Sequence, residues 1–241
     1  MINYLATQKN WQNAFSDTIT SFAELAQALD LPIDSFDSQV GQFPLKVPRR
    51  FVQKMGKGDI HDPLLKQVLP TFQETVQVTS FVTDPLDEQH ANPVKGIIHK
   101  YASRVLIPVT GACVVNCRYC FRQHFDYHEN LPTQNDWQAI SAYITAHPAV
   151  NEVILSGGDP LSLSNRRLLE IFTTLEALPQ VQTIRIHTRV PVMIPERLDE
   201  PLLARFANSR CHIVMVIHAN HPNEIDQETQ IFLGKAKKAG V

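Results

Sequence analysis

The chain has 241 residues, of which 44% are hydrophobic and 19% are charged, and its formal net charge is −2. This is the composition of an ordinary globular protein, and the near-neutral charge argues against tight non-specific binding to nucleic acid. The first residues lack the basic start and apolar core of a signal peptide, and no apolar run approaches the roughly 20 residues that span a bilayer. We therefore expect a cytoplasmic protein that binds neither nucleic acid nor membrane.

The first hundred residues are expected to form a small helical region. Asp17–Leu29 has an amphipathic helical pattern. Pro48–Met55 begins with a proline suited to the first helical position, and Pro63–Leu69 has the length of one or two turns. Phe81–Lys95 shows no such pattern and predicts an irregular extension. We divide the chain into a helical N-terminal region with its extension, 1–100, and an α/β region, 101–241.

From Arg104 onward, apolar runs alternate with helical patterns. The expected strands are Arg104–Thr110, Val150–Leu155, Val181–His187 and Ile213–His218. The expected helices are Asn135–Ala146, Asn165–Leu178, Glu200–Asn208 and Glu224–Ala239. Apolar strands separated by helices of about ten to fifteen residues predict a parallel sheet built from βα units. We predict an α/β fold, a partial (β/α) barrel with four such units.

The C-terminal residues Ala239-Gly240-Val241 follow the fourth helix, where another strand would begin. Four units leave the last strand with an unpaired apolar edge, which native proteins avoid. We therefore expect the chain to be incomplete at its C-terminus; the alternative is that another chain covers this edge.

Three of the four cysteines lie in one run, Cys113-Val-Val-Asn-Cys117-Arg-Tyr-Cys120, after the first expected strand. Three thiolates can hold three irons of a [4Fe–4S] cluster and leave the fourth iron open to a small molecule. A zinc site completed by Cys211 or His124 is the alternative, but only Cys117 and Cys120 have the spacing of a zinc knuckle. A disulfide framework does not fit cysteines crowded into one loop. We expect Cys211 to be a small buried hydrophobe.

Polar residues also follow the other expected strands. They are Gly157-Gly158-Asp159, His187-Thr188-Arg189 and His218-Ala219-Asn220-His221. Functional loops of a βα barrel follow the carboxyl ends of its strands. Glycines permit close backbone approach, and a carboxylate can pair with an ammonium group. The alternative for the glycine turn is a plain strand-to-helix connection with Asp159 at a helix start. His187 and His218 have no assigned role.

The cysteine spacing resembles that of the radical S-adenosylmethionine (SAM) enzymes, and further runs resemble the lysine 2,3-aminomutase family. Those runs are Asp84-Pro85-Leu86, His99-Lys100-Tyr101 with Arg104, Cys120-Phe121-Arg122, Ser156-Gly157-Gly158-Asp159-Pro160-Leu161, Thr188-Arg189-Val190-Pro191 and His221-Pro222-Asn223-Glu224-Ile225. Three runs are similar to the shorter proteobacterial branch that makes (R)-β-lysine for elongation factor P: Val47-Pro48-Arg49-Arg50-Phe51, Asp62-Pro63-Leu64-Leu65-Lys66-Gln67-Val68 and Cys120-Phe121-Arg122-Gln123-His124-Phe125. The resemblance covers nearly the whole chain.

This resemblance implies a barrel of the radical SAM type and an isomerase that converts L-α-lysine to (R)-β-lysine. It implies three cofactors: a [4Fe–4S] cluster, SAM and pyridoxal 5′-phosphate (PLP). The reduced cluster gives SAM an electron, and the resulting 5′-deoxyadenosyl radical removes a hydrogen from lysine held on PLP. The resemblance also implies a flavodoxin-type reductant and a functional link to elongation factor P and its β-lysine ligase.

The resemblance implies roles for ten residues by position. The cluster ligands are Cys113, Cys117 and Cys120. The residues that meet the SAM amino group are Gly157, Gly158 and Asp159. Arg122 matches the arginine that binds the lysine carboxylate, and Tyr101 and Arg104 are candidates for binding the pyridoxal phosphate group. Arg189 lies on the face that contacts the cofactors, as does His221. The alternatives are a solvated surface arginine for Arg122 and a structural role for Tyr101 and Arg104.

In the family, the PLP-binding lysine and the carboxylates that recognise the substrate ε-ammonium fall beyond the equivalent of Val241. The lysines near the C-terminus, Lys235, Lys237 and Lys238, lie on the exterior of the last expected helix. We therefore expect this chain, as the N-terminal two-thirds of an enzyme, to bind cluster and SAM but to be inactive alone. The alternatives are a radical SAM aminomutase for another amino acid, such as glutamate or arginine, and an inactive iron–sulfur-binding fragment.

Overall fold

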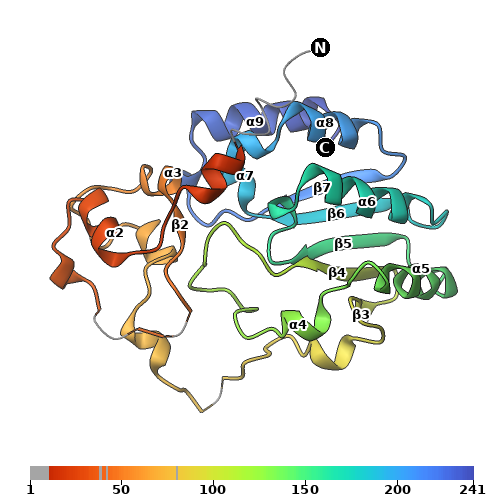
Figure 1. Cartoon of the computed structure of the whole chain (residues 1–241), viewed down its shortest axis with the longest axis horizontal. Helices are drawn as coiled ribbons and strands as arrows, with labels where there is room; N and C mark the ends of the chain where they lie inside the picture. Colours follow the sequence, from red (N-terminus) through yellow and green to blue (C-terminus); the bar gives the residue numbers. More distant parts are fainter. Residues whose placement is uncertain (1–10, 38–39, 42, 80) are drawn as a thin grey trace.

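The structure, a computed structural model, describes residues 11–37, 40–41, 43–79 and 81–241. Its centre is a five-stranded sheet in the order β3-β4-β5-β6-β7 (Figure 1). The strands are Ile98–Tyr101 (β3), Arg104–Thr110 (β4), Glu152–Gly157 (β5), Thr183–Thr188 (β6) and His212–Ile217 (β7). β4 to β7 run parallel in sequence order, whereas β3 pairs antiparallel with β4. The predicted parallel α/β architecture is confirmed, with one antiparallel strand added.

A helix follows each parallel strand. These helices are Asp136–Ala146 (α5), Asn165–Glu176 (α6), Glu200–Ala207 (α8) and Gln227–Lys238 (α9). Side-chain caps fix three of their starts, since Ser164, Asp199 and Asp226 each accept a hydrogen bond from a backbone N–H of the first turn. The last helix therefore begins later than expected, because Asp226 caps it and Pro222–Glu224 forms a separate 3₁₀ turn (η7).

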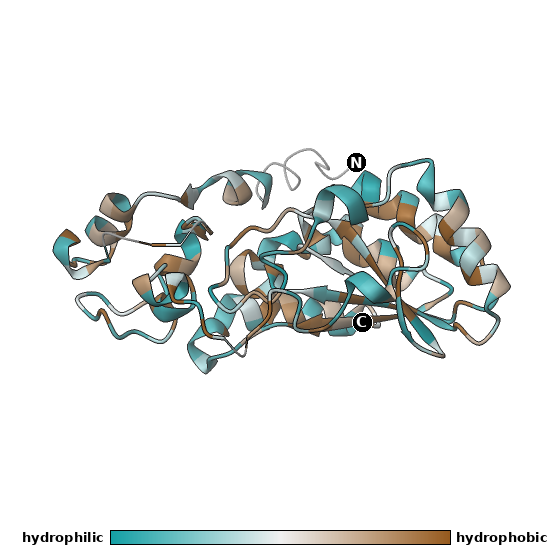
Figure 2. Cartoon of the chain, turned by 90° about the horizontal axis from the view of Figure 1, so that it is seen from below, coloured by the Kyte–Doolittle hydropathy of each residue, from teal (hydrophilic) through white to brown (hydrophobic). Residues whose placement is uncertain are grey.

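The two faces of the sheet have different environments. Val105, Val153 and Ile184 are fully buried beneath the helices. Because side chains alternate along a strand, Leu106 and Ile154 point to the opposite face, where they line a cavity. The second apolar face of these strands is therefore a cavity wall, not packed core. The apolar strands appear brown between largely teal surface segments in Figure 2.

The N-terminal region forms a red-to-orange lobe beside the sheet in Figure 1. It contains the helices Phe22–Ala28 (α2) and Arg49–Val52 (α3), and the strands Thr18–Ile19 (β1) and Val47–Pro48 (β2), which pair antiparallel. The helix expected over Asp17–Leu29 is therefore too long, because its first residues join a strand pair. Pro48 does not occupy the first helical position; it lies in β2 with an extended backbone and precedes α3 as its cap residue.

Several short elements were not expected. They are β3, Tyr127–Asn130 (α4), Val190–Met193 (α7), and the 3₁₀ turns Ile33–Ser35 (η1), Phe72–Thr75 (η3), Gln89–Ala91 (η4), Pro160–Ser162 (η5) and Pro195–Arg197 (η6). The turn expected in Pro63–Leu69 is the 3₁₀ turn Leu65–Gln67 (η2). The extension expected to be irregular contains only η4. In the described part of the chain, no helix is both long and apolar enough to cross a membrane.

The N-terminal region holds the cysteine loop from one side. Lys46 Nζ donates to the carbonyl of Cys113 at 2.7 Å, and the Lys46 carbonyl accepts from the backbone N–H of Asn116 at 2.9 Å. The backbone N–H of Arg118 donates to the carbonyl of Gln67 at 2.9 Å. These bonds give a loop without regular structure a fixed position above the sheet.

Candidate active site

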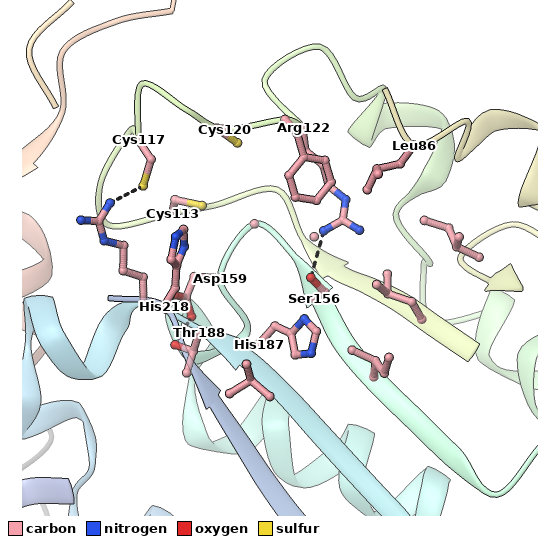
Figure 3. Close-up of a pocket in the computed structure, with 18 of the residues that line it drawn as sticks. Leu86, Cys113, Cys117, Cys120, Arg122, Ser156, Asp159, His187, Thr188 and His218 are labelled. Carbon is pink, nitrogen blue, oxygen red and sulfur yellow. Dashed lines mark hydrogen bonds between the residues drawn. The ribbon is translucent and has the colours of Figure 1, made fainter. Parts of the chain in front are cut away.

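A cavity of about 650 Å³ lies over the inner face of the sheet. It is lined by residues that follow four different strands: the cysteine loop after β4, the glycine turn after β5, Thr188 and Arg189 at the end of β6, and His218 after β7. Figure 3 shows these segments converging on one space. Segments that follow four different strands thus share one cavity, and this cavity is the candidate active site.

The cysteine triplet lines this cavity with all three thiols half-buried. Burial, followed by the nearby Asp159 carboxylate, raises the pKa of Cys113 to about 12, and burial also raises the pKa of Cys120. Thiols in such surroundings become thiolates only when a cation compensates their charge, as cluster irons do. The donor set therefore fits a cluster.

The zinc alternative finds no fourth ligand in Cys211. Its thiol is buried just before β7 and donates to the carbonyl of Val181 at 3.3 Å. Within the described residues, no three His, Cys, Asp or Glu side chains are grouped so as to hold a single metal ion. Cys211 is the small buried residue that its place before an apolar strand predicts.

Arg189 reaches the same loop from the end of β6. Its Nη1 donates to the Sγ of Cys117 at 2.8 Å (Figure 3). Its Nη2 donates to Gln67 Oε1 at 2.5 Å and to Glu224 Oε2 at 3.0 Å. The Arg189 side chain is 5% exposed and that of Glu224 is fully buried. Arg189 therefore lies at the end of the cavity formed by the cysteine loop, which we call the cluster end after the cluster that the cysteines are proposed to hold.

Gln67 and Glu224 complete this polar group from two distant segments. Gln67 Nε2 donates to Glu224 Oε1 at 3.1 Å, and the same oxygen accepts from the backbone N–H groups of Asn220 and His221 at 2.8 and 3.0 Å. Gln67 Oε1 also accepts from the Tyr119 hydroxyl at 3.2 Å. Sequence reasoning missed both residues as site residues, although each lies within a run that carries the family resemblance.

The glycine turn after β5 packs directly on the cysteine loop. Gly157 has a φ of +104°, and a Cβ on Gly158 would lie 2.5 Å from the Ala112 carbonyl oxygen. The backbone N–H of Gly158 donates to the Thr110 carbonyl at 2.6 Å. These glycines are required because one backbone passes against another.

The Asp159 carboxylate is buried and fully engaged by the protein. It accepts from the Thr188 hydroxyl and the backbone N–H of Arg189, both at 2.6 Å, and from the N–H groups of Leu161 and Val190 at 3.0 Å each. Burial raises the pKa of Asp159, against the effect of these hydrogen bonds. The geometry gives Asp159 the capping role that was the alternative to a SAM contact, and it joins the ends of β5 and β6.

Arg122 is a buried arginine, not the surface arginine of the alternative interpretation. Its Nε and Nη2 donate to the two carboxylate oxygens of Glu88 at 2.8 and 2.6 Å, and its Nη1 donates to Ser156 Oγ at 3.0 Å (Figure 3). The side chains of Arg122 and Glu88 are 8% and 6% exposed. The bidentate edge formed by Nε and Nη2 is thus occupied by Glu88, whereas Nη1 has only the neutral Ser156 as its partner, and Arg122 lines the cavity. Glu88 was not expected from the sequence, because it lies in the irregular extension.

Tyr101 and Arg104 line the opposite, open end of the cavity. Tyr101 is 66% exposed, and the guanidinium carbon of Arg104 lies 5.8 Å from its ring centroid. Lys100, exposed at the same end, donates to the carbonyl of Leu86. The cavity is thus lined at this end by two cationic side chains and a phenol hydroxyl, which are groups that can bind an anionic ligand.

Three histidines lie near the strand ends with different surroundings. Burial, then the charges of Arg185 and Arg122, lowers the pKa of His187, which lines the cavity. Burial, then Arg189, lowers the pKa of His218. His221 does not line the cavity; its Nδ1 accepts from the backbone N–H of Asn223 at 3.2 Å and caps η7.

Residues 107–229 match the sequence model of the Radical SAM superfamily. The chain is similar to L-lysine 2,3-aminomutase of Haemophilus influenzae, with 45% identity over 223 residues that cover 91% of this chain and 66% of that protein. It is 42% identical over 239 residues to L-lysine 2,3-aminomutase of Escherichia coli strain K12, covering 98% of this chain and 70% of that protein. The enzyme of the same name from Clostridium subterminale is 31% identical over 229 residues, which are 93% of this chain and 55% of that protein. The chain spans about two thirds of the first two relatives and just over half of the third.

Proposed function

The chain belongs to the lysine 2,3-aminomutase family of the Radical SAM superfamily, and from this premise we propose that it serves the conversion of L-α-lysine to (R)-β-lysine. The observation that carries the proposal is the convergence of three half-buried thiols, a tight glycine turn and a buried arginine on one cavity. Three cysteines with no fourth cysteine in the cavity are what an open iron requires.

In this proposal Cys113, Cys117 and Cys120 hold the cluster. When bound together, cluster and SAM supply a carbon radical that can take a hydrogen atom from an unactivated carbon. The chain's own residues place and shield that chemistry. The backbone of Gly157 and Gly158 brings the SAM amino group close to the cysteine loop, while Asp159 holds the turn through its four hydrogen bonds.

Arg122 binds the substrate carboxylate through Nη1, the guanidinium nitrogen that is not hydrogen-bonded to Glu88. Glu88 and Ser156 fix the plane of the guanidinium, so the carboxylate is oriented by hydrogen bonds. Glu88 neutralises the positive charge of Arg122. The site therefore binds an anion through the direction of its hydrogen-bond donors more than through net charge.

PLP is proposed to bind at the open end, with its phosphate near Tyr101 and Arg104. Phosphate is a dianion that takes hydroxyl and guanidinium donors, and Tyr101 and Arg104 supply one of each at the cavity lining. When bound, PLP delocalises an unpaired electron next to the substrate nitrogen. The lysine that lines the described cavity is Lys100, whose Nζ donates to the Leu86 carbonyl, and we do not assign it a covalent role.

The identity of the amino acid is the part of the proposal open to a second candidate. Both carboxylates that line the described cavity, Glu88 and Asp159, are committed to protein donors. Neither is available for an ε-ammonium group, which lysine has and glutamate lacks. In the family, the carboxylates that recognise this group fall beyond the equivalent of Val241, so the described cavity favours neither lysine nor another amino acid, and a radical SAM aminomutase that acts on another amino acid is the second candidate.

The proposed setting follows from the same family premise. We propose a cytoplasmic enzyme with a flavodoxin-type one-electron donor, whose product serves the modification of elongation factor P through a β-lysine ligase. Support for this branch is the resemblance of the runs 47–51, 62–68 and 120–125 to it. It is tested by asking whether loss of the gene removes β-lysine from elongation factor P.

The cluster part is tested by anaerobic reconstitution of the chain with iron and sulfide. We expect about four irons per chain, loss of most of this iron in C113A, C117A and C120A, and full iron content in C211A, whose thiol lies outside the cavity. Tight binding of one zinc in place of iron, or equal loss of iron in C211A, contradicts the proposal.

The reaction is tested by incubating the full-length protein, of which this chain is expected to be the N-terminal two-thirds, with SAM, PLP, dithionite and a single amino acid under anaerobic conditions. Formation of β-lysine from lysine, measured by mass spectrometry, supports the first candidate. Turnover of glutamate or arginine with no β-lysine from lysine supports the second. An R122K variant, which keeps the charge but not the fork, is expected to raise KM for the amino acid at least tenfold, about 1.4 kcal/mol.

A further inference from the structure

We infer that Arg189 is a hydrogen-bond donor to the cluster through the sulfur of Cys117, and that it raises the cluster's reduction potential while Gln67 and Glu224 hold it in place. This inference rests on the proposed function, since it needs a cluster on the three cysteines. It goes further by giving a buried charged group control over how readily the cluster is reduced and the radical chemistry starts.

The first step is the contact. Arg189 Nη1 lies 2.8 Å from Cys117 Sγ. Hydrogen bonds to ligand sulfurs withdraw electron density from iron and favour the reduced state, and they are a principal determinant of iron–sulfur potentials. A guanidinium adds a positive charge close to a centre that becomes more negative when it accepts an electron.

The second step is the rigidity of the donor. Nη2 of Arg189 bonds Gln67 Oε1 and Glu224 Oε2, and the guanidinium carbon lies 5.5 Å from the ring centroids of both Phe51 and Tyr119. The arginine is 4% exposed. A buried guanidinium anchored at Nη2 by two acceptors and flanked by two rings has few other rotamers, so Nη1 stays directed at the sulfur.

The third step is an unused donor. Arg189 Nε is buried and has no acceptor among the described residues. A buried N–H without a partner is costly in a finished core, and this one sits on a side chain that already contacts a cluster ligand. The orphaned donor points to an acceptor that the protein does not supply, and the inorganic sulfide or a SAM carboxylate next to the cluster has that chemistry.

The fourth step is the charge balance around Arg189. Glu224 is fully buried and pairs with the arginine at 3.0 Å. The pair is neutral overall, so the arginine can remain buried in the absence of a cluster. Removal of either charge leaves the other one beside the cluster, and the two removals must shift the potential in opposite directions.

The redox step is a one-electron reduction, in which the [4Fe–4S] cluster goes from the 2+ to the 1+ state. The electron comes from a low-potential one-electron donor, dithionite in the experiment and a flavodoxin-type protein in the proposed function. No proton or bond at Arg189 changes in this step. The arginine acts only by stabilising the extra negative charge.

The experiment is a potentiometric titration of the reconstituted chain, with the reduced cluster followed by electron paramagnetic resonance. We expect R189Q to lower the midpoint potential and E224Q to raise it, each by about 59 mV. At a fixed potential, a shift of this size changes the ratio of reduced to oxidised cluster about tenfold. R189K, which keeps a charge without the fork, is expected to fall between R189Q and the wild type.

The matched control is R118Q. Arg118 lies on the same loop between Cys117 and Cys120, but its guanidinium bonds Glu74 and the Phe43 carbonyl and contacts no thiol. A smaller potential shift in R118Q than in R189Q supports the inference. Equal shifts mean that any positive charge near the loop has the effect, and they overturn the specific role of Arg189.

The outcomes separate the inference from the proposed function. If the wild-type chain binds no cluster, the proposed function fails. If it binds a cluster and cleaves SAM while R189Q and E224Q, at full iron content, keep the wild-type potential, the inference alone fails. If R189Q does not fold, R189K and E224Q still test it, because their predicted shifts differ in sign.

Discussion

The two ends of the cavity differ in how many of their polar side-chain atoms have a hydrogen-bond partner in the protein. At the cluster end, Arg189, Gln67, Glu224 and Asp159 form a buried network in which nearly every polar atom has a protein partner. At the open end, Tyr101 is exposed and its main charged neighbour is Arg104.

This difference indicates which half of the site is built in advance. A preorganised polar network holds its shape before a ligand arrives and loses little entropy on binding. Exposed side chains are ordered only when a ligand contacts them. The cluster and SAM should therefore bind a site that is already formed, whereas the open end should take its final form with PLP.

Substitution of Glu88 should have the largest effect on stability, because it is the partner of a buried arginine between the two ends. E88A leaves Arg122 buried and uncompensated, and should lower the free energy of unfolding by about 3–5 kcal/mol in urea denaturation. The double variant E88A/R122A should lose less than the sum of the single variants. The exposed pair Arg167–Glu170, 2.9 Å apart, is the control and should contribute less than about 1 kcal/mol. Additive losses at Glu88 and Arg122 would show that the pair is not coupled.

Gly158 tests the packing of the cluster end. G158A places a Cβ 2.5 Å from the Ala112 carbonyl oxygen, which is backbone and cannot rotate away. We expect a loss of about 1–3 kcal/mol in unfolding free energy, and loss of SAM cleavage at retained iron content. The control is G234A in α9, where no atom lies within 4 Å of the added Cβ; it should gain up to about 1 kcal/mol. Unchanged SAM cleavage in G158A would show that the turn is not part of the SAM site.

Asp226 tests a cap remote from both ends. Burial raises its pKa, but hydrogen bonds from Thr229 and Lys54 outweigh this and lower the pKa to about 2. A carboxyl with a lowered pKa stabilises the fold above its unfolded pKa of about 3.9, and this contribution is lost as the pH falls through about 2. D226A should cost about 1 kcal/mol at pH 7, discounted for its 37% exposed side chain.

The difference between D226A and the wild type should therefore shrink steadily below pH 4 in denaturation curves recorded at several pH values. An undiminished difference at pH 2 would contradict the assigned pKa. SAM cleavage at neutral pH should be the same in both proteins, because α9 begins away from the cavity lining.

Substitution of Tyr101 should change the stability least, and it tests directly whether the open end binds PLP. Y101A removes an exposed side chain, so the unfolding free energy should change by less than about 0.5 kcal/mol. PLP affinity, measured by absorbance titration, should fall about tenfold, while SAM cleavage without PLP stays at the wild-type rate. A PLP affinity equal to the wild type would remove Tyr101 from the proposed phosphate site.

The sequence predicted the parts of this molecule that depend on local patterns. The four parallel strands follow from apolar runs such as Arg104–Thr110, and the grouping of the cysteine loop with Gly157 and Arg189 follows from the rule that parallel strands end at one edge. The boundaries failed where a distant segment intervened, as when β2 pairs with residues expected to be helical.

The residues that were missed act through contacts between distant segments. Gln67 is 122 positions from Arg189, and Glu88 is 34 positions from Arg122. No periodicity or spacing in one sequence relates such positions, because their encounter depends on how the N-terminal region and the extension lie against the sheet. Their charges and amide groups are visible in the sequence, but their partners are not.

The central claim is that the three cysteines leave an iron open to SAM at a preformed end of the cavity. The most direct test is to reduce the reconstituted chain with dithionite, add SAM without PLP or amino acid, and measure 5′-deoxyadenosine by chromatography. We predict that the wild-type chain and C211A form 5′-deoxyadenosine and that C113A, C117A and C120A do not. A fully loaded wild-type cluster that forms none, or a cysteine variant that forms as much as the wild type, would contradict the account.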